Sequence, residues 1–288
     1  MKASFVIVNY NRKEELLVTI AKTKLIIKNQ EADFEIIIVD NASNDESAAA
    51  VKALYNDVIV IENKVNTGAP AWNLGFAQAK GKYFIILDDD SHMESGLNEA
   101  LDYLDNHSEV GVLALNIIGG AYNTNGWTNL SDTVGFIGCG AIWRKELYQK
   151  IGGYAEWIFL YTNEWDYGIR CLDAGYKLRY FQDCHIIHRT SSINRTNKRL
   201  KVFSVRNEMA IIYKYFDRDN RNKYIFRVFI NNLKGVYGLG FPSVPWYFEA
   251  LKEFFKLKKI LTHTPVKKEV QEIYSKAYWS TQSIFKKF

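Results

Sequence analysis

The chain has 288 residues, of which 48% are hydrophobic and 24% are charged. This composition is that of a globular protein with a sizeable core, as one large domain or one and a half smaller ones. The cysteines, Cys139, Cys171 and Cys184, form no Cys-x-x-Cys pair, which argues against a zinc cage or disulfide scaffold and favours a reducing compartment. No stretch approaches about 18 apolar residues and residues 1–2 lead at once into a strand-like run, so neither a transmembrane helix nor a signal peptide is predicted.

The net charge of +5 is unevenly distributed along the chain. Residues 195–288 hold 20 Lys and Arg against 7 Asp and Glu, whereas residues 1–194 hold 17 against 25. A basic, aromatic tail on an acidic body can meet anionic lipid, nucleic acid or an acidic partner. Because no recognisable nucleic-acid motif accompanies the charge, we do not expect nucleic-acid binding.

The first third of the chain alternates short apolar runs with helical patterns. The runs predict strands at residues 4–8, 35–39, 58–61 and 83–87. Between them, helices are predicted at residues 14–29, 45–55 and 69–79, with Asn44 as the N-cap of the second. Continuous apolar strands separated by helices indicate a mostly parallel α/β sheet that is covered on both faces.

The pattern changes after the fourth strand. A helix at residues 96–106 and a strand at 110–118 precede a polar loop at 119–131 and a strand at 134–143, which Gly138 and Gly140 interrupt. Helices are then predicted at 147–154 and 163–174, and short strands at 178–181 and 184–187. The remainder reads as basic helices at 200–215, 222–237, 246–258 and 266–275. We therefore expect an α/β domain over residues 1–200, divided near residue 110, and a helical region over 201–288.

Polar residues follow the predicted parallel strands at the point where each one ends. Ligands of parallel sheets bind beyond these carboxyl ends. The polar segments there are Asn9-Tyr10-Asn11, Asp40-Asn41, Asn66-Thr67-Gly68 and Asp88-Asp89-Asp90. Three adjacent carboxylates repel one another unless a cation is near, which suggests a hard divalent metal shared with a ligand's phosphates. The alternative is a solvated acidic turn that opens the next helix.

The order and spacing of several short motifs resemble the family 2 glycosyltransferases of the GT-A fold, a Rossmann-like arrangement. The resemblance covers roughly residues 1–215. It rests on the four polar segments and on Asn73-Leu74-Gly75, Gly81-Lys82-Tyr83, Gly138-Cys139-Gly140-Ala141, Ile151-Gly152-Gly153-Tyr154, Asn163-Glu164-Trp165-Asp166, Ala174-Gly175-Tyr176 and His188.

The resemblance implies a nucleotide-sugar site in residues 1–110 and an acceptor site in residues 111–200. Asp40 matches the family's base-contacting Asp, and the ring of Tyr10 can cover a base. Asp90 would ligate Mn²⁺ or Mg²⁺, with His188 near the diphosphate or the metal. The full set implied for the donor is Asn9, Tyr10, Asp40, Gly68, Asp88 and Asp89, the last near the ribose.

Asn163-Glu164 stands where the family usually has Glu-Asp. The second position carries the general base, so Glu164 falls on that role, with a side chain one methylene longer than Asp. Asp166 is the runner-up, although the resemblance gives it a bracing role on the acceptor-side helix. The implied reaction is inverting, with direct attack of an acceptor hydroxyl on the anomeric carbon.

We therefore predict a metal-assisted glycosyltransferase of surface polysaccharide biosynthesis, in the cytoplasm or on the inner face of the plasma membrane. The expected acceptor is a glycan or a lipid-linked acceptor, and the expected donor is a UDP-, dTDP- or GDP-sugar. The segment Val205-Arg206-Asn207-Glu208 resembles one often found after the catalytic region of rhamnosyltransferases, which suggests a rhamnosyltransferase-like assignment. The alternatives are a sugar nucleotidyltransferase, although residues 9–12 lack that class's Gly-rich loop, and a non-catalytic nucleotide-sugar-binding protein.

Aromatic residues raise two further possibilities. Trp127, Trp143, Trp157 and Trp165 can offer faces to sugar C–H surfaces, and we expect one or two of them to touch the acceptor. In the tail, Phe248, Leu251, Phe254 and Phe255 alternate with Lys252, Lys256, Lys258 and Lys259, which predicts an amphipathic surface helix. This helix would lie on an anionic membrane or pack in a dimer.

Overall fold

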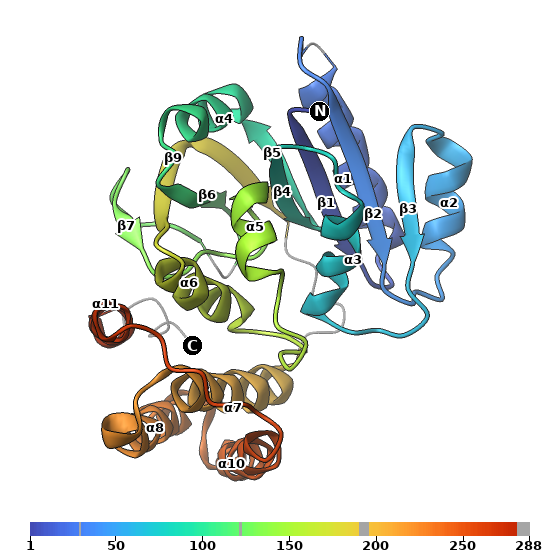
Figure 1. Ribbon diagram of the computed structural model, residues 1–288. Coiled ribbons are helices and arrows are strands. Elements are labelled where there is room, and N and C mark those ends of the chain that lie inside the picture. The colour runs from blue at the N-terminus through green and yellow to red at the C-terminus, as the bar shows by residue number, and fades with distance from the viewer. Residues whose placement is uncertain (29, 121–122, 190–195, 281–288) are drawn as a thin grey trace.

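A mixed sheet with helices on both faces stands on a tier of helices in the computed structural model, which describes residues 1–28, 30–120, 123–189 and 196–280 (Figure 1). The sheet has nine strands, whose main path runs β3-β2-β1-β4-β8-β6-β9-β5, with β7 paired to β9. The strands are β1 (Ala3–Asn9), β2 (Phe34–Asp40), β3 (Val58–Glu62), β4 (Tyr83–Asp88), β5 (Ser91–Ser95), β6 (Val110–Ile118), β7 (Asp132–Thr133), β8 (Ala141–Arg144) and β9 (Lys177–His188).

The first four strands pair in parallel, as predicted. Alternate residues of each strand enter opposite cores, because successive side chains point to opposite faces. Phe5 and Ile7 pack in the core covered by α1 (Lys13–Ile27), α2 (Ser47–Leu54) and α4 (Leu97–Asn106). Val6 packs in the opposite core with α3 (Trp72–Gln78), α5 (Lys145–Ile151) and α6 (Asn163–Asp173). Both faces are apolar, which explains the continuous hydrophobic runs in the sequence.

The second half of the sheet departs from the sequence prediction. The strand expected at residues 134–143 is shorter in the structure, where only β8 remains. Residues 134–140 form a closely packed loop instead, since a Cβ on Gly140 would lie 2.6 Å from the side chain of Ile117. The two short strands predicted at residues 178–181 and 184–187 are one continuous strand, β9. Its pairing with β6 shifts register between Leu115 and Asn116. β5 was not predicted from the sequence. It directly follows the acidic triplet and pairs with β9.

The N-cap predicted for α2 is wrong. The helix begins at Ser47, and the residue before it, Glu46, has a left-handed backbone. Asp45, not Asn44, accepts a hydrogen bond from the first helical backbone N–H, that of Ser47, at 3.1 Å. The same carboxylate accepts the backbone N–H of Lys13 at 2.9 Å, so Asp45 joins the starts of α1 and α2.

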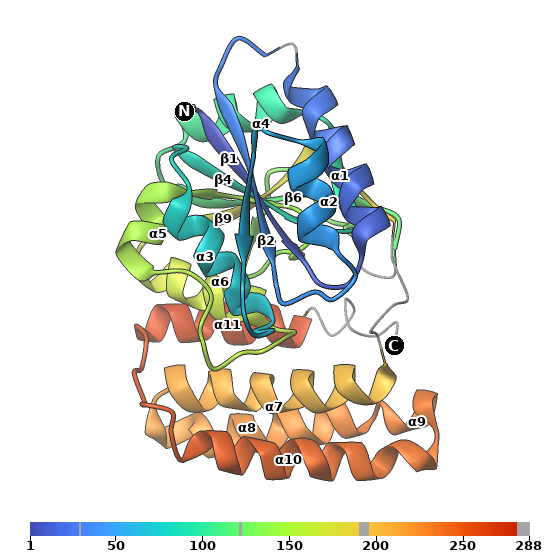
Figure 2. The same ribbon diagram turned by 90° about the vertical axis from the view of Figure 1, so that its right-hand side faces the viewer.

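The C-terminal residues form a tier beneath the sheet (Figure 2). It consists of α7 (Asn197–Tyr215), α8 (Arg218–Leu233), α9 (Val236–Leu239), α10 (Val244–Lys258) and α11 (Lys268–Ser280). The single helix expected at 222–237 is split into α8 and α9. The core of the tier includes Ile169 of α6, so the tier and the α/β body share packing. Within the described ranges, every helix is too short or too polar to cross a membrane.

Candidate active site

The acidic triplet forms the turn between β4 and β5, at the carboxyl edge of the parallel strands. Asp88 ends β4, and its backbone N–H donates to the hydroxyl of Ser91 at 2.9 Å. That hydroxyl in turn donates to the carbonyl of Cys139 at 2.9 Å. The turn is thereby fixed to the glycine-containing loop that precedes β8. Three carboxylates gathered in a partly buried turn create a strongly negative locus.

Asp88, Asp90 and His188 come together as one potential metal site. One ligand atom of each lies within 4.8 Å of the other two, and His188 Nε2 is 3.3 Å from Asp90 Oδ1. The pairing of β5 with β9 causes this proximity, since it sets Ser91 opposite His188. Two carboxylates and an imidazole are a donor set that suits a divalent cation, so the residues fit the predicted metal.

Arg12 offsets part of the triplet's charge. Its guanidinium donates to Asp89 Oδ1 at 2.8 Å and lies 3.2 Å from Asp90 Oδ2. Asp89 also accepts the backbone N–H of Tyr10 at 3.2 Å. Burial raises the pKa of Asp89 to about 7, Arg12 opposes that rise, and Asp90 and Asp88 add to it. Asp89 thus anchors the loop after β1, while its predicted contact with a ribose stays a prediction.

Arg189, which sequence reasoning overlooked, links the triplet to α1 and β9. Its backbone N–H donates to the carbonyl of Asp90 at 2.9 Å. Its side chain donates to the Asp89 carbonyl at 3.2 Å, to Thr19 Oγ1 at 2.6 Å and to Glu15 Oε2 at 2.6 Å. The residue therefore holds the end of β9, and with it His188, against the acidic turn. The one signal in the sequence was an arginine directly after the motif histidine.

Asp40, which is predicted to contact the base, lies at the end of β2 in a network of hydrogen bonds. Asn9 Nδ2 donates to Asp40 Oδ1 at 2.9 Å, and the backbone N–H of Ser43 donates to Oδ2 at 3.1 Å. Asn9 also donates to the hydroxyl of Ser43 at 3.0 Å. Both Asp40 and Asn9 are buried. Asn9 therefore orients Asp40. Contact of Asn9, Asp40 or the half-buried Tyr10 with a nucleotide stays a prediction.

Gly68 lies where the loop after β3 meets the segment that precedes α6. The backbone N–H of Ala69 donates to the carbonyl of Phe159 at 2.7 Å. A Cβ on Gly68 would lie 1.9 Å from that carbonyl oxygen, and the residue has a φ of +70°, so this position requires glycine on both counts. The predicted binding role of Gly68 is thus accompanied by a structural one.

Glu164, the predicted base, is the second residue of α6 and is partly exposed. A Cβ on Gly138 would lie 2.5 Å from Glu164 Oε1, so Gly138 leaves room for this carboxylate. Burial raises the pKa of Glu164 to about 7, and the negative charge of Asp88 adds to the rise, while a backbone hydrogen bond from Gly138 opposes it. The charge of Asp88 thus acts on the Glu164 carboxyl, while a site shared by Glu164 and the acidic turn stays a prediction.

Asp166 has a different environment. It is fully buried and accepts hydrogen bonds from Arg170 Nε at 2.9 Å and from the hydroxyl of Tyr215 at 2.8 Å. Tyr215 belongs to α7, so Asp166 braces α6 against the helical tier. From the sequence, Asp166 was expected to brace the acceptor-side helix or, as the runner-up to Glu164, to act as the base. Both of its carboxylate oxygens accept hydrogen bonds, which fits the bracing role.

Several residues considered from the sequence lie in the core. Trp143 is fully buried and stacks on Tyr167 with ring centroids 3.5 Å apart, so it is not an acceptor platform. Trp165 packs edge-on against Tyr274 of α11, and Trp127 against Tyr180. The three cysteines are free and buried, and burial raises the pKa values of Cys171 and Cys184.

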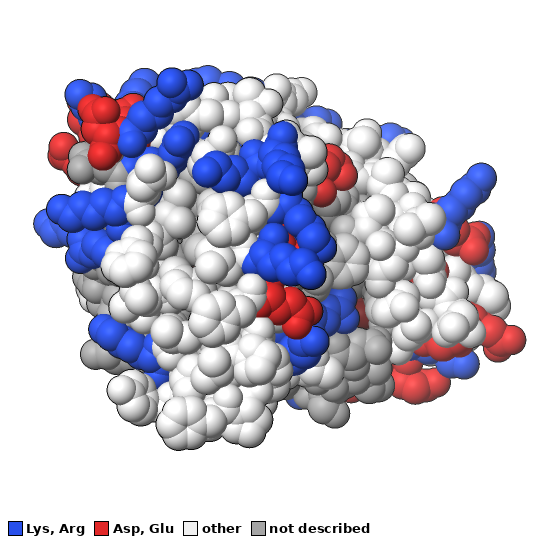
Figure 3. Space-filling view, turned by 90° about the horizontal axis from the view of Figure 1, so that it is seen from below, with Lys and Arg blue, Asp and Glu red and all other residues white. Residues whose placement is uncertain are grey.

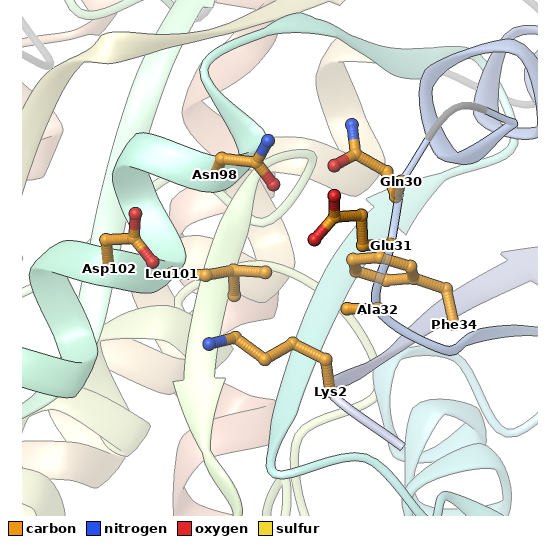
Figure 4. Close-up of a pocket in the computed structure, with 8 residues that line it drawn as sticks. All are labelled: Lys2, Gln30, Glu31, Ala32, Phe34, Asn98, Leu101 and Asp102. Atoms are coloured by element: carbon orange, nitrogen blue, oxygen red, sulfur yellow. The ribbon is translucent and has the colours of Figure 1, made fainter.

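A cavity of about 450 Å³ opens at the opposite, amino end of the strands. It shares none of the predicted site residues, and its lining is mixed in charge and contains few apolar groups (Figure 4). The lining residues are Lys2, Gln30, Glu31, Ala32, Phe34, Asn98, Leu101 and Asp102. Nothing in this lining resembles the convergent acidic site at the carboxyl edge.

Comparisons with known proteins give this geometry a context. The family model described as "Glycosyl transferase family 2" matches residues 4–166. A poly(ribitol-phosphate) beta-glucosyltransferase of Bacillus spizizenii is 36% identical over 100 residues, which are 33% of this chain and 16% of that protein. The chain thus spans less than a fifth of the length of this curated relative.

Solved structures show the same fold. The Staphylococcus aureus TarS fragment 1–349 in complex with UDP-GlcNAc has a TM-score of 0.62 and 16% identity, covering 95% of this chain and 84% of that one. A mannosyltransferase of Pyrobaculum calidifontis in complex with GDP-Man and Mn²⁺ has a TM-score of 0.58 and 17% identity, covering 87% and 74%. The predicted GT-A fold is confirmed.

Proposed function

Because the chain belongs to glycosyl transferase family 2, we propose that it moves a sugar from a nucleotide-diphosphate sugar to a hydroxyl of a glycan or lipid-linked acceptor, with inversion. The observation that carries this proposal is the cluster of Asp88, Asp90 and His188, with Glu164 beside the loop whose Cys139 carbonyl accepts a hydrogen bond from Ser91, directly after the triplet. Such a transfer needs a general base and positive charge that stabilises the leaving diphosphate, which Glu164 and a cation in this cluster would supply.

The donor's nucleotide would bind along the carboxyl ends of β1 and β2. Asp40, which Asn9 and Ser43 hold in place, would accept hydrogen bonds from the base or the ribose, and the ring of Tyr10 would cover the base. The diphosphate would then lie at the acidic turn, where Asp88, Asp90 and His188 would hold Mn²⁺ or Mg²⁺. When bound, this metal supplies positive charge that stabilises the diphosphate as a leaving group.

Glu164 acts as the general base in this account. Its carboxylate takes the proton of the acceptor hydroxyl, whose oxygen forms a bond to the anomeric carbon. The bond between that carbon and the diphosphate oxygen breaks on the opposite face, and the nucleoside diphosphate leaves with the electron pair. A pKa of about 7 suits a base that works near neutral pH. Asp166 serves this step indirectly, by bracing α6.

The names of the relatives suggest the biological setting. The Bacillus spizizenii relative acts on poly(ribitol-phosphate), and the solved neighbours hold UDP-GlcNAc or GDP-Man. We therefore place this chain in surface polysaccharide biosynthesis, with a UDP-, dTDP- or GDP-sugar as donor. Its free, buried cysteines fit a reducing compartment such as the cytoplasm.

A donor-hydrolysis panel tests the proposal. UDP-, dTDP- and GDP-sugars are incubated with the protein with and without Mn²⁺ or Mg²⁺, and the release of nucleoside diphosphate is followed. We expect metal-dependent release from at least one donor, lowered on the order of 100-fold by Asp90→Ala. The control is Asp102→Ala, on the exposed face of α4. The proposal fails if no donor is turned over with metal, or if Asp90→Ala retains wild-type release.

A further inference from the structure

The outward side of α8 and α10 carries two stripes that combine apolar and basic residues. On α8, Lys223, Phe226, Ile230 and Lys234 are exposed and recur at three- and four-residue intervals. On α10, the same spacing relates the exposed residues Phe248, Lys252, Phe255 and Lys259, the last at the helix C-cap. Residues at such intervals share one helical face, so each helix presents aromatic or aliphatic groups and lysines together to solvent.

The turn segment between the two helices, which contains α9, adds the most exposed aromatic groups of the described chain. Tyr237 is 95% exposed and Phe241 is 86% exposed, whereas Phe248 and Phe255 are 57% and 51% exposed. Gly240, with a φ of +80°, lets the chain reverse between them. Large apolar side chains held this far into water are unfavourable unless something covers them.

The two stripes and the turn form one continuous surface, called here the α8–α10 face. The helices lie side by side, with ring centroids of Phe229 and Phe248 6.3 Å apart. Seen from below, this end of the molecule shows Lys and Arg around surface that is neither acidic nor basic, with Asp and Glu at a few places (Figure 3). The acidic residues of α10 are paired with lysines, Glu249 with Lys198 of α7 and Glu253 with Lys256. The stripes themselves contain no carboxylate.

We propose that the α8–α10 face binds the surface of an anionic lipid membrane. Aromatic side chains are stable at the level of lipid headgroups, where one part of the ring is in an apolar medium and another is near water. Lysines near a negatively charged membrane add electrostatic attraction. A second copy of the chain is a poor occupant, because it would set lysines against lysines. This proposal does not depend on the chemistry of the active site.

The position of the face is consistent with work on a membrane-bound acceptor. The carboxyl ends of the parallel strands, which carry the site, point toward the helical tier, and the α8–α10 face is the outer surface of that tier (Figures 1 and 2). A membrane bound there would lie on the same side of the molecule as the site.

Vesicle flotation tests the proposal on the full-length chain. Vesicles of phosphatidylcholine alone and with phosphatidylglycerol are compared at low and high salt. One double variant, Tyr237→Ser with Phe241→Ser, removes the apolar tip, and a second, Lys252→Glu with Lys259→Glu, reverses the charge. Matched controls are Leu25→Ser with Leu54→Ser, which are 64% and 63% exposed on α1 and α2, and Lys64→Glu with Lys80→Glu on the body.

We expect flotation with the anionic vesicles, at least fivefold weaker in 0.5 M salt and in each α8–α10 variant, and unchanged in the controls. Thermal melting checks that every variant is folded. The proposal is overturned if the wild type does not float with anionic vesicles, or if it floats equally with neutral ones. It is also overturned if the variants float as the wild type does. A wild-type dimer that the Tyr237→Ser, Phe241→Ser variant abolishes, without flotation, would assign the face to a second copy instead.

Discussion

Glu164 is held in a setting that disfavours its charge. Its surroundings raise its pKa from an ordinary value near 4.5 to about 7. In the unfolded chain the carboxyl ionises at its ordinary pKa, so between pH 4.5 and 7 the unfolded state releases a proton that the folded state keeps. Ionised Glu164 therefore lowers the free energy of unfolding above pH 7, and this penalty is absent below pH 4.5.

The first prediction concerns Glu164→Gln. We expect this variant to lose transfer activity by roughly 100-fold or more, because no base remains, while donor binding is unchanged. At pH 8 we expect it to be more stable than the wild type by on the order of 1–3 kcal/mol, discounted for the partial exposure of the side chain. At pH 4.5 this gain should disappear. Thermal melting at both pH values measures it.

A matched control for this variant is Glu146→Gln, on the exposed side of α5. It should change neither transfer nor the pH dependence of stability. If Glu164→Gln transfers sugar at the wild-type rate, Glu164 is not the base. If its melting temperature relative to wild type is the same at pH 4.5 and 8, the carboxyl is not perturbed as described.

Individual site residues were predictable to the extent that they lie at strand ends. The positions of Asp40, Asp88 and Asp90 followed from apolar runs that stop at carboxylates. Arg12 and Arg189 were not predicted as site residues, because their roles depend on side chains that reach from β1 and β9 to the acidic turn. Side-chain contacts between segments that are far apart in the sequence leave no periodic pattern or fixed spacing by which to predict them.

Among the elements, α7 holds the loop that presents Glu164. Asn207, fully buried in α7, donates to the carbonyls of Leu160 and Tyr161 at 2.9 and 2.8 Å. Tyr161 and Thr162 both have left-handed backbones, with φ of 65° and 59°. Such conformations are costly for residues other than glycine and persist only where the surroundings hold them. Asn207 is therefore a positioning residue for α6.

The second prediction is that Asn207→Ala lowers kcat about tenfold or more while KM for the donor changes little. Without the two hydrogen bonds, the loop at Tyr161–Thr162 relaxes and Glu164 moves at the start of α6. Stability should fall by about 1–3 kcal/mol, since two partly buried carbonyls lose their donor. Steady-state kinetics and chemical denaturation measure the two effects.

The control is Asn232→Ala. Asn232 of α8 also donates two hydrogen bonds, to Glu208 and to the carbonyl of Val228, but it touches no part of the loop. It should lose stability and keep kcat. Equal losses of kcat in both variants would mean that Asn207 acts only through stability.

The elements of the parallel half were predicted within a few residues, because each strand is a continuous apolar run that ends at a polar segment. The remainder was less predictable for local reasons. β5 contains Ser91, His92 and Glu94 and lacks a strand pattern, and it exists because β9 pairs with it. The loop at 134–140 contains apolar residues that resemble a strand, yet its glycines serve close packing.

At the scale of the whole molecule, the body and the tier are joined by shared packing. Trp165 of α6 contacts Tyr274 of α11, and Asp166 is bonded to Tyr215 of α7. The charge asymmetry seen in the sequence corresponds to an acidic site in the body and a basic outer face on the tier. The sequence boundary near residue 200 stays a prediction, since the two parts share a core.

We expect the carboxyl edge of the sheet to hold a nucleoside diphosphate together with a divalent metal. Titration calorimetry of UDP, dTDP and GDP, each with and without Mn²⁺, tests it most directly in the wild type, Asp90→Asn and the control Asp102→Asn. We predict binding of at least one nucleotide that is tightened by Mn²⁺ and weakened tenfold or more by Asp90→Asn alone. Binding of no nucleotide, or binding that neither Mn²⁺ nor Asp90→Asn alters, would contradict the account.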